Sequence, residues 1–173
     1  MDCKAARPEF DLARSALVYE GEAMRLVLRL KRGEKFLSET LAQILLPMLE
    51  DFADADALTF VPMTEKAEKE RGYNQSKLLA ERLAEASGLE LLSSVRKLHE
   101  TPPQKSLNLK QRRENLKSCF KIEDKKSFRD KKVVLIDDVL TTGATASELA
   151  RRMKKAGAVR VYVLTVASVP NQK

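Results

Sequence analysis

The sequence has 173 residues but no tryptophan, one histidine and two cysteines. Cys3 and Cys119 lie far apart in unlike contexts, so a disulfide framework is not expected. Cys119 is interpreted as a small, half-buried residue. A catalytic cysteine needs a neighbouring base, and His99 is the sole histidine that could supply one. Composition therefore gives little support for thiol chemistry or for a disulfide-bonded scaffold.

Long hydrophobic runs are also absent. No apolar stretch approaches the roughly 18–20 residues that a membrane-spanning helix needs. The first residues, Met1 to Lys4, are followed by charges rather than by the apolar core of a signal peptide. Hydrophobic residues make up 43% and charged residues 33% of the chain, which is typical of a globular domain with one core. We therefore expect a cytoplasmic protein without membrane insertion.

Positive charge is concentrated in one stretch of the chain. The net charge is +7, and residues 101–132 contain eleven Lys or Arg against four Asp or Glu, so this stretch accounts for the whole excess. It is either a solvated surface or a segment that meets polyanions, which could be the phosphates of a small substrate or a nucleic-acid backbone.

Hydrophobic periodicity predicts an alternation of strands and helices. The expected strands are residues 14–20, 58–61, 89–96, 120–122, 133–136 and 159–166. The expected helices are residues 22–31, 34–53, 108–116 and 146–156, and a further one between Gly72 and Gly88. Pro47 should kink or split the second of these helices, and residues 63–74 should be irregular. This alternation predicts an α/β fold, a single domain with a central, mostly parallel sheet flanked by helices.

The strand at residues 133–136 leads into the most informative segment. Asp137 and Asp138 follow it, where the strand is expected to leave the sheet, and a helix begins after a small loop rich in hydroxyl groups. Ligands of open α/β sheets lie at the carboxyl ends of strands. The loop consists of Thr141, Thr142, Gly143, Ala144 and Thr145. Its backbone N–H groups, its hydroxyl groups and the helix N-terminus can together surround a phosphate.

The two carboxylates indicate a different part of the ligand. Paired acceptors suit the two neighbouring hydroxyls of a ribose, so acids beside a phosphate loop predict a ribose 5-phosphate site. Alternatively, Asp137 and Asp138 only cap the loop while a threonine caps the helix. Neither a P-loop nor the dinucleotide-binding glycine pattern is present.

Residues 133–145 resemble the thirteen-residue phosphoribosyl pyrophosphate (PRPP) signature of type I phosphoribosyltransferases. The resemblance implies that Asp137 and Asp138 hold the ribose hydroxyls and that residues 141–145 hold the 5′-phosphate. It also implies Mg²⁺ bound with PRPP near the two acids, a small N-terminal hood over residues 1–57, and a core over residues 58–168.

Further motifs along the chain are Val61-Pro62-Met63, Arg71-Gly72-Tyr73-Asn74-Gln75, Thr101-Pro102-Pro103-Gln104, Leu107, Arg112-Arg113-Glu114-Asn115 and Phe120, with Tyr19-Glu20-Gly21 and Lys31 near the N-terminus. Together with the signature they resemble the ComF family, whose members are phosphoribosyltransferase-like and are associated with competence and DNA uptake. This family commonly begins with a four-cysteine zinc module. One cysteine cannot form a tetrahedral zinc site, so no zinc is expected here.

Transfer of the phosphoribosyl group would release pyrophosphate, which requires cations. Lys66, Arg71, Lys105, Arg112 and Arg113 are the candidates, and residues 97–111 are expected to form a lid over the ligand. Each of these cations could also be an ordinary surface charge. Tyr73, Asn74 and Gln75 belong to the family motif, although Asn74 could simply cap a helix.

Three functions therefore stay open. The chain could be a phosphoribosyltransferase with an unidentified acceptor, a non-catalytic sensor of PRPP or a nucleotide, or a protein that handles single-stranded DNA during uptake. The low aromatic content, 5%, argues against a base-stacking surface for tight direct DNA binding. Proteins of the competence machinery and a second copy of the chain are the other expected partners.

Overall fold

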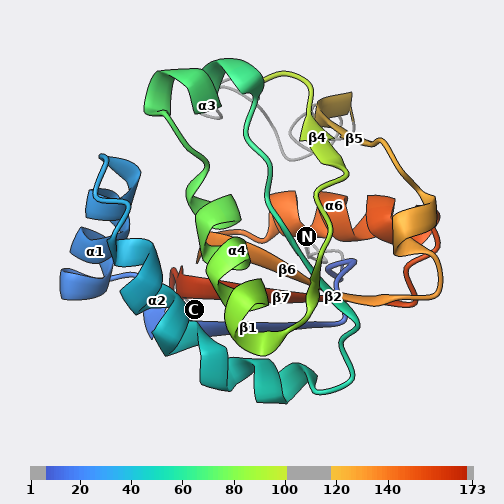
Figure 1. The fold of residues 1–173 in the computed structure, drawn as a ribbon, viewed down its shortest axis with the longest axis horizontal. Coiled ribbons are helices and arrows are strands. Elements are labelled where there is room, and N and C mark those ends of the chain that lie inside the picture. Colours follow the sequence, from blue (N-terminus) through green and yellow to red (C-terminus); the bar gives the residue numbers. More distant parts are fainter. Residues whose placement is uncertain (1–6, 101–117, 171–173) are drawn as a thin grey trace, which may run out of the picture.

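The protein is described from a computed structural model, which describes residues 7–100 and 118–170 (Figure 1). Its elements in chain order are β1 (Leu12–Val18), α1 (Gly21–Lys31), α2 (Leu37–Leu45), the 3₁₀ helix η1 (Leu46–Phe52), β2 (Ala57–Phe60), α3 (Glu65–Arg71), α4 (Gln75–Ser87), β3 (Glu90–Leu91), β4 (Val95–Lys97), β5 (Phe120–Ile122), the 3₁₀ helix η3 (Lys126–Phe128), β6 (Lys132–Leu140), α6 (Ala144–Lys155) and β7 (Arg160–Ser168). None of the described helices is long and apolar enough to cross a membrane.

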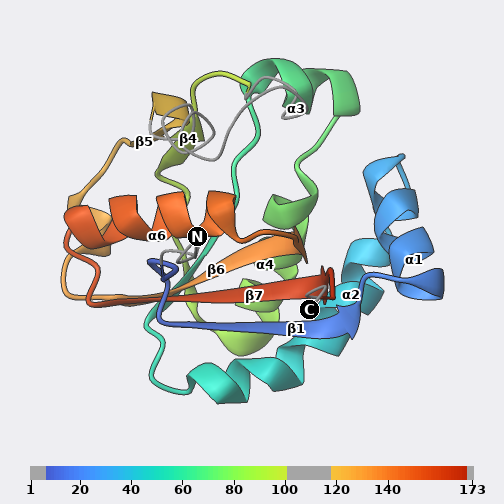
Figure 2. The same cartoon turned by 180° about the vertical axis from the view of Figure 1, so that it is seen from behind.

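Five strands form the main sheet in the order β1-β7-β6-β2-β3, and every neighbouring pair is parallel. Helices α2 and α4 cover one face and α6 covers the other, as Figures 1 and 2 show from opposite sides. Strands β4 and β5 form a separate antiparallel ribbon. The predicted α/β fold with a central parallel sheet is confirmed.

The central strand β6 explains why the core divides into two layers. Successive side chains of a strand point to opposite faces. Val134 and Ile136 pack among the residues under α2 and α4, whereas Val133 and Leu135 pack against α6. All four are fully buried. An apolar strand with no polar face is therefore accounted for by helices on both sides of the sheet.

Most predicted elements are present, and the differences have local causes. The helix expected over residues 34–53 is split as predicted, because Pro47 lies in the first turn of η1. The irregular segment expected at residues 63–74 is wrong, since α3 forms there. That helix buries none of its residues, so it has no apolar periodicity to detect. The strand expected at residues 89–96 is two short strands in different sheets. The helix predicted at residues 108–116 lies outside the described residues.

Gly157 joins α6 to β7 and permits a close backbone approach. Its φ is +109°, and a Cβ there would lie 3.1 Å from the Cα of Arg129. The Gly157 carbonyl also accepts a hydrogen bond of 2.9 Å from the Asp130 N–H, which ties the turn to the chain before β6.

We expect Gly157→Ala to lower the free energy of unfolding by about 2–4 kcal/mol, because it adds a steric clash to an unfavourable φ. Gly33→Ala is the matched control: its φ is +122°, but no atom lies within 4 Å of its added Cβ. Gly33→Ala should cost only about 1–2 kcal/mol. Urea denaturation of both variants measures the difference, and equal losses would contradict a role for the Arg129 contact.

Candidate functional site

The candidate site lies at the carboxyl end of β6. The two strands that pair with β6, β2 and β7, end at different points along it. Strand β2 pairs with β6 only as far as Phe60 and Ile136, and the Val61 N–H then donates to the Ile136 carbonyl at 3.0 Å. Strand β7 continues beside β6 to Leu140. The expectation that the strand leaves the sheet before Asp137 is therefore wrong. The two acids still belong to β6, and only the side toward β2 is open.

The two acids have different surroundings, because they point to opposite faces of β6. Asp137 is half-buried and lines a pocket on the same face as α6, whereas Asp138 is buried and 5% exposed. Both carboxylates are held from the start of α4. Ser76 Oγ donates to Asp137 Oδ1 at 2.9 Å, and Gln75 Nε2 donates to Asp138 Oδ2 at 2.8 Å. Consecutive residues of one helix thus position both acids.

The surroundings of Asp137 destabilise the charged form of its carboxylate. Its burial and the neighbouring charge of Asp138 raise its pKa to about 7, against weaker opposing effects of the Ser76 hydroxyl, the Asp138 N–H and Lys31. Its Oδ1 accepts both the Ser76 hydrogen bond and one of 2.9 Å from the Asp138 N–H. From the described residues, Oδ2 accepts no hydrogen bond. That oxygen is available for a ligand.

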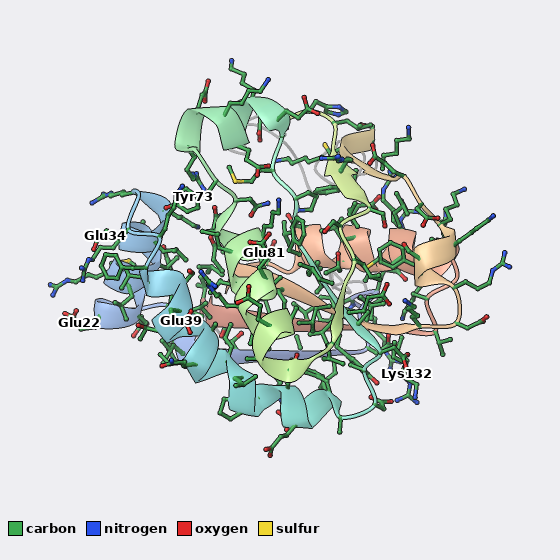
Figure 3. The ribbon with its side chains drawn as sticks, in the orientation of Figure 1. Glu22, Glu34, Glu39, Tyr73, Glu81 and Lys132 are labelled. Carbon is green, nitrogen blue, oxygen red and sulfur yellow. The ribbon has the colours of Figure 1, made fainter. Side chains whose placement is uncertain are left out.

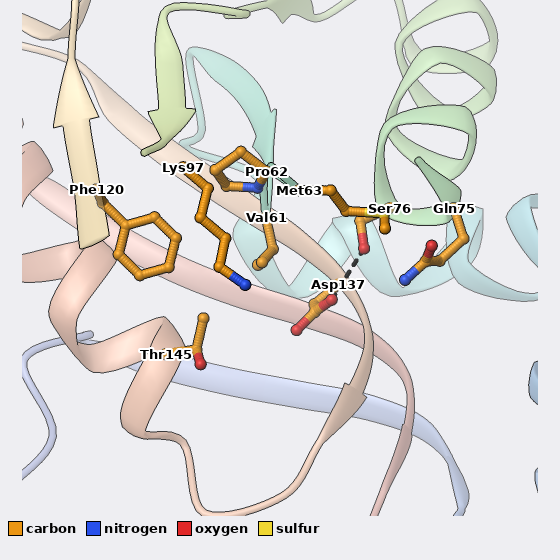
Figure 4. Close-up of a pocket in the computed structure, with 9 residues that line it drawn as sticks. All are labelled: Val61, Pro62, Met63, Gln75, Ser76, Lys97, Phe120, Asp137 and Thr145. Carbon is orange, nitrogen blue, oxygen red and sulfur yellow. Dashed lines mark hydrogen bonds between the residues drawn. The ribbon is translucent and has the colours of Figure 1, made fainter. Parts of the chain in front are cut away.

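A pocket of about 190 Å³ brings together segments that are distant in sequence (Figure 4). It is lined by Val61, Pro62, Met63, Gln75, Ser76, Lys97, Phe120, Asp137 and Thr145. Two of the predicted ligand-binding residues, Asp137 and Thr145, therefore share one pocket, together with Gln75 of the family motif. Phe120 from β5 and the turn after β2 supply its apolar wall.

Lys97 is a cation of this pocket that the sequence analysis did not nominate. Its side chain extends from the end of β4 into the pocket (Figure 4) and is 18% exposed. Its Nζ donates to Glu100 Oε2 at 2.7 Å, while Thr64 Oγ1 donates to Glu100 Oε1 at 2.5 Å. Lys97, followed by Thr64, lowers the pKa of Glu100. Glu100 therefore neutralises Lys97, which is the one cation among the described residues that line this pocket.

The loop expected to hold a phosphate turns sharply into the start of α6. Gly143 has a φ of +72° and precedes α6, whose first turn no side chain caps. Phe10 packs beneath it, 3.5 Å from where a Cβ would lie. The Thr142 hydroxyl is 3.4 Å from the Ala144 N–H, which is a weak contact. Thr141 lines a separate hollow of about 340 Å³ between residues 13–15 of β1 and the ends of β6 and β7.

Gly72, Tyr73 and Asn74 of the motif at residues 71–75 each have a structural role in the fold. Gly72 ends α3 with a φ of +83°. The Tyr73 hydroxyl donates to the Leu30 carbonyl and accepts from the Gly33 N–H at 3.0 Å, so it lies between α1 and α4 (Figure 3). Asn74 caps α4 by accepting from Ser76 N and Lys77 N, and its Nδ2 donates to the Val61 carbonyl at 3.0 Å. The helix-cap interpretation of Asn74 is confirmed.

Of the predicted cations, the two that the structure describes, Arg71 and Lys66, do not line the pocket. Arg71 Nη1 donates to Gln75 Oε1 at 2.7 Å, so it supports the site through Gln75. Lys66 lies on α3 with its side chain 85% exposed, 3.9 Å from Glu70. Lys105, Arg112 and Arg113 lie outside the described residues, as does the lid expected at residues 97–111 beyond Glu100.

An acid, a lysine and a helix N-terminus thus meet at the carboxyl edge of an open parallel sheet, where α/β domains bind their ligands. The model of the phosphoribosyl transferase domain family matches residues 69–173. The chain therefore belongs to the phosphoribosyl transferase domain family. In the solved structure of glutamine PRPP amidotransferase from Bacillus subtilis, the matching fold has a TM-score of 0.50 at 23% identity, over 79% of this chain and 26% of that one.

Curated relatives carry names that refer to competence and to DNA utilization. Competence protein F of Haemophilus influenzae is 32% identical over 151 residues, which is 82% of this chain and 66% of the relative. Competence protein ComFC of Streptococcus pneumoniae is 30% identical over 78% of this chain and 57% of the relative. DNA utilization protein YhgH of Escherichia coli K12 is 33% identical over 62% and 47%. The chain thus spans about half to two thirds of these relatives, and the ComF relationship predicted from the motifs is confirmed.

The raised pKa of Asp137 gives a testable dependence of stability on pH. Because the folded state keeps this proton up to about pH 7 while the unfolded chain loses it near its ordinary value of 3.8, the free energy of unfolding should fall across that window. Asp137→Asn removes the titrating group, so the variant should be more stable than wild type by about 1–3 kcal/mol at neutral pH and above.

Urea denaturation between about pH 4 and pH 8 would measure the difference in unfolding free energy between the two proteins, in which the titrating groups that do not interact with Asp137 cancel. A difference that does not change with pH would show that Asp137 keeps an ordinary pKa.

Proposed function

We propose that this domain binds PRPP together with Mg²⁺ at the carboxyl edge of the sheet. The observation that carries the proposal is the pocket shared by Asp137, Thr145 and Lys97, which presents an acid, a hydroxyl and a cation to one ligand. A carboxylate can accept from ribose hydroxyls, and a hydroxyl and a cation can donate to phosphate oxygens. The PRPP signature resemblance of residues 133–145 specifies the same ligand.

The 5′-phosphate would lie in the loop formed by residues 141–145. The positive φ of Gly143 turns the chain into α6, whose first turn has backbone N–H groups without a side-chain cap. Helix N-termini favour anions through these donors and through the helix dipole. Thr145, at the second residue of α6, would add its hydroxyl from the pocket side.

The ribose and pyrophosphate would lie toward β2 and β4. Asp137 Oδ2 would accept from the ribose hydroxyls, with Asp138 behind it. Lys97 would meet the pyrophosphate by exchanging its contact with Glu100 for a phosphate oxygen. Arg71 and the cations of residues 101–117, Lys105, Arg112 and Arg113, are proposed to contribute from the edge of the pocket and from a closing lid.

The side chains of the pocket suit a Mg²⁺ ion that is held mainly by the phosphates of PRPP and by one carboxylate of the protein. Among the described residues, no three His, Cys, Asp or Glu side chains gather into a group that could hold a metal ion by themselves. Mg²⁺ keeps several waters and commonly binds through one or two carboxylates plus substrate phosphates, for which Asp137 with its open oxygen is suited. When bound, the ion would neutralise charge on the leaving pyrophosphate.

A transfer reaction would place developing positive charge of the ribose ring beside Asp137 and negative charge of pyrophosphate beside Lys97. The acceptor would enter from the N-terminal part, residues 1–57, which we propose as a hood over the core of residues 58–168. Within this N-terminal part, helix α1 stands at the carboxyl edge of the sheet beside the site (Figures 1 and 2), whereas β1 is a strand of the main sheet and α2 covers one of its faces.

A non-catalytic PRPP or nucleotide sensor is the second proposal. It is favoured by the neutralisation of Lys97 by Glu100 and of Lys31 by Asp138, which leaves few cations for a leaving group in the described part of the site. For either function, the names of the relatives suggest a setting in competence and DNA uptake, with single-stranded DNA or competence-machinery proteins as partners.

Isothermal titration calorimetry should show PRPP binding that depends on Mg²⁺. Asp137→Asn should weaken it at least about 30-fold and Lys97→Met about 10-fold, because each removes a charged contact to the ligand. Asp51→Asn, which removes an exposed carboxylate paired with Arg14, should leave the affinity unchanged. If Asp137→Asn bound PRPP as tightly as wild type, the assignment of the ribose site would be wrong.

Release of pyrophosphate distinguishes the two functions. Wild-type protein is incubated with PRPP, Mg²⁺ and a library of nucleobases and amine metabolites, and pyrophosphate is measured with a coupled assay. A transferase releases pyrophosphate with at least one acceptor, and Lys97→Met slows that release. Binding without release across the library supports the sensor.

A further inference from the structure

Asp138 is a buried carboxylate that faces away from the ligand pocket. It is 5% exposed and does not line the pocket, whereas its neighbour Asp137 does. Burying a carboxylate is costly unless both charge and hydrogen-bonding capacity are compensated. The structure compensates this one from two elements outside the strand.

The charge of Asp138 is compensated by the last residue of α1. Lys31 Nζ lies 3.0 Å from Asp138 Oδ2, and the Lys31 side chain is 30% exposed. Lys31 also stands in the final turn of α1, where a cation is favoured by the helix dipole. The nearby cation Arg29 differs, because it pairs with Glu34 at the surface with half of its side chain exposed.

The hydrogen-bonding capacity of Asp138 is met by a relay from α3. Arg71 donates to the Gln75 oxygen at 2.7 Å, which turns the Gln75 amide nitrogen toward Asp138 Oδ2 at 2.8 Å. The Lys31 ammonium and the Gln75 amide therefore converge on the same oxygen. This oxygen links the end of α1 to the start of α4, on the face of β6 opposite to the ligand pocket.

The position of Lys31 is itself fixed by Tyr73. The buried Tyr73 hydroxyl bonds to the Leu30 carbonyl and accepts from the Gly33 N–H, on either side of Lys31 in the sequence. The end of α1 is thereby fastened to the start of α4, from which Ser76 and Gln75 hold the two acids. A displacement of α1 would change the contacts of Asp138 first.

We propose that Lys31 is a positioning residue of the ribose site, which acts through Asp138 to couple helix α1 to ligand binding. The inference rests on the proposed PRPP function. Lys31 touches neither the pocket nor the phosphate loop, so its contribution is indirect. With Lys31 in place, Asp138 stays on its own face of β6 and Asp137 keeps the geometry that the ligand needs. By thermodynamic reciprocity, bound PRPP then stabilises the docked position of α1.

A double-mutant cycle on PRPP affinity tests the route through Asp138. Lys31→Met should weaken binding of Mg²⁺–PRPP about 10-fold, since it leaves a buried charge unpaired beside the site. In an Asp138→Asn background, Lys31→Met should change the affinity less than about 2-fold, because the charge that it neutralises is gone. Lys31→Arg should restore most of the affinity. Arg29→Met is the matched control on the same helix and should bind as wild type.

Hydrogen exchange provides a readout that a purely structural role would not change. In wild type, Mg²⁺–PRPP should slow amide exchange both in residues 143–147 and in α1. In Lys31→Met, at saturating ligand, protection of residues 143–147 should persist while the ligand-induced protection of α1 is lost.

The outcomes separate the inference from the function on which it rests. Equal effects of Lys31→Met in the two backgrounds, or unchanged ligand-induced protection of α1 in this variant, would overturn the inference while PRPP binding stands. Absence of PRPP binding and of protection in wild type would overturn the proposed function and the inference with it.

Discussion

The unequal length of the two strand pairings along β6 is the constraint on which the site depends. Parallel strands share hydrogen bonds only where both are extended, and β2 stops at Phe60 while β7 continues to Ser168. Residues 137–140 are therefore held straight by one neighbour and open on the other side. The start of α4 fills part of that opening, because Asn74 is bonded to the Val61 carbonyl and presents Gln75 and Ser76 to the acids. A rigid sheet edge and a capped helix thus define one pocket.

Successive side chains of β6 point to opposite faces, so the two adjacent acids Asp137 and Asp138 have different surroundings and different roles. Asp138 is stabilised by Lys31 and Gln75 on the face of α1 and α4, and it has no free approach to solvent. Asp137, on the face of α6, has a pKa raised to about 7 by its burial and by the charge of Asp138. A site that holds an unfavourable charge in advance is suited to a ligand that brings cations or hydroxyl donors to it. The burial of Asp137 and the neighbouring charge of Asp138 thus both lower the stability of the folded protein and favour a ligand that brings compensating groups.

Local patterns predicted much of the fold, and long-range contacts account for what they missed. The apolar run of residues 133–136, the break at Pro47 and the glycine stops of the helices were sufficient to place strands and helices. Helix α3 was missed because it has no buried face. The two acids and the loop of residues 141–145 could be nominated as a site because they are contiguous in sequence. Lys97 and Ser76 could not, since only the folding of β4 and α4 toward β6 brings them to Asp137, and no local period records that approach.

The central claim is that the open side of β6 and the start of α6 together hold one sugar phosphate. A crystal structure of the protein soaked with PRPP and Mg²⁺ tests it most directly. The account predicts the 5′-phosphate within hydrogen-bond distance of the backbone N–H groups of residues 143–145, with a ribose hydroxyl on Asp137 Oδ2 and a pyrophosphate oxygen on Lys97. Density for PRPP elsewhere on the molecule, with the pocket at Asp137 left empty, would contradict it.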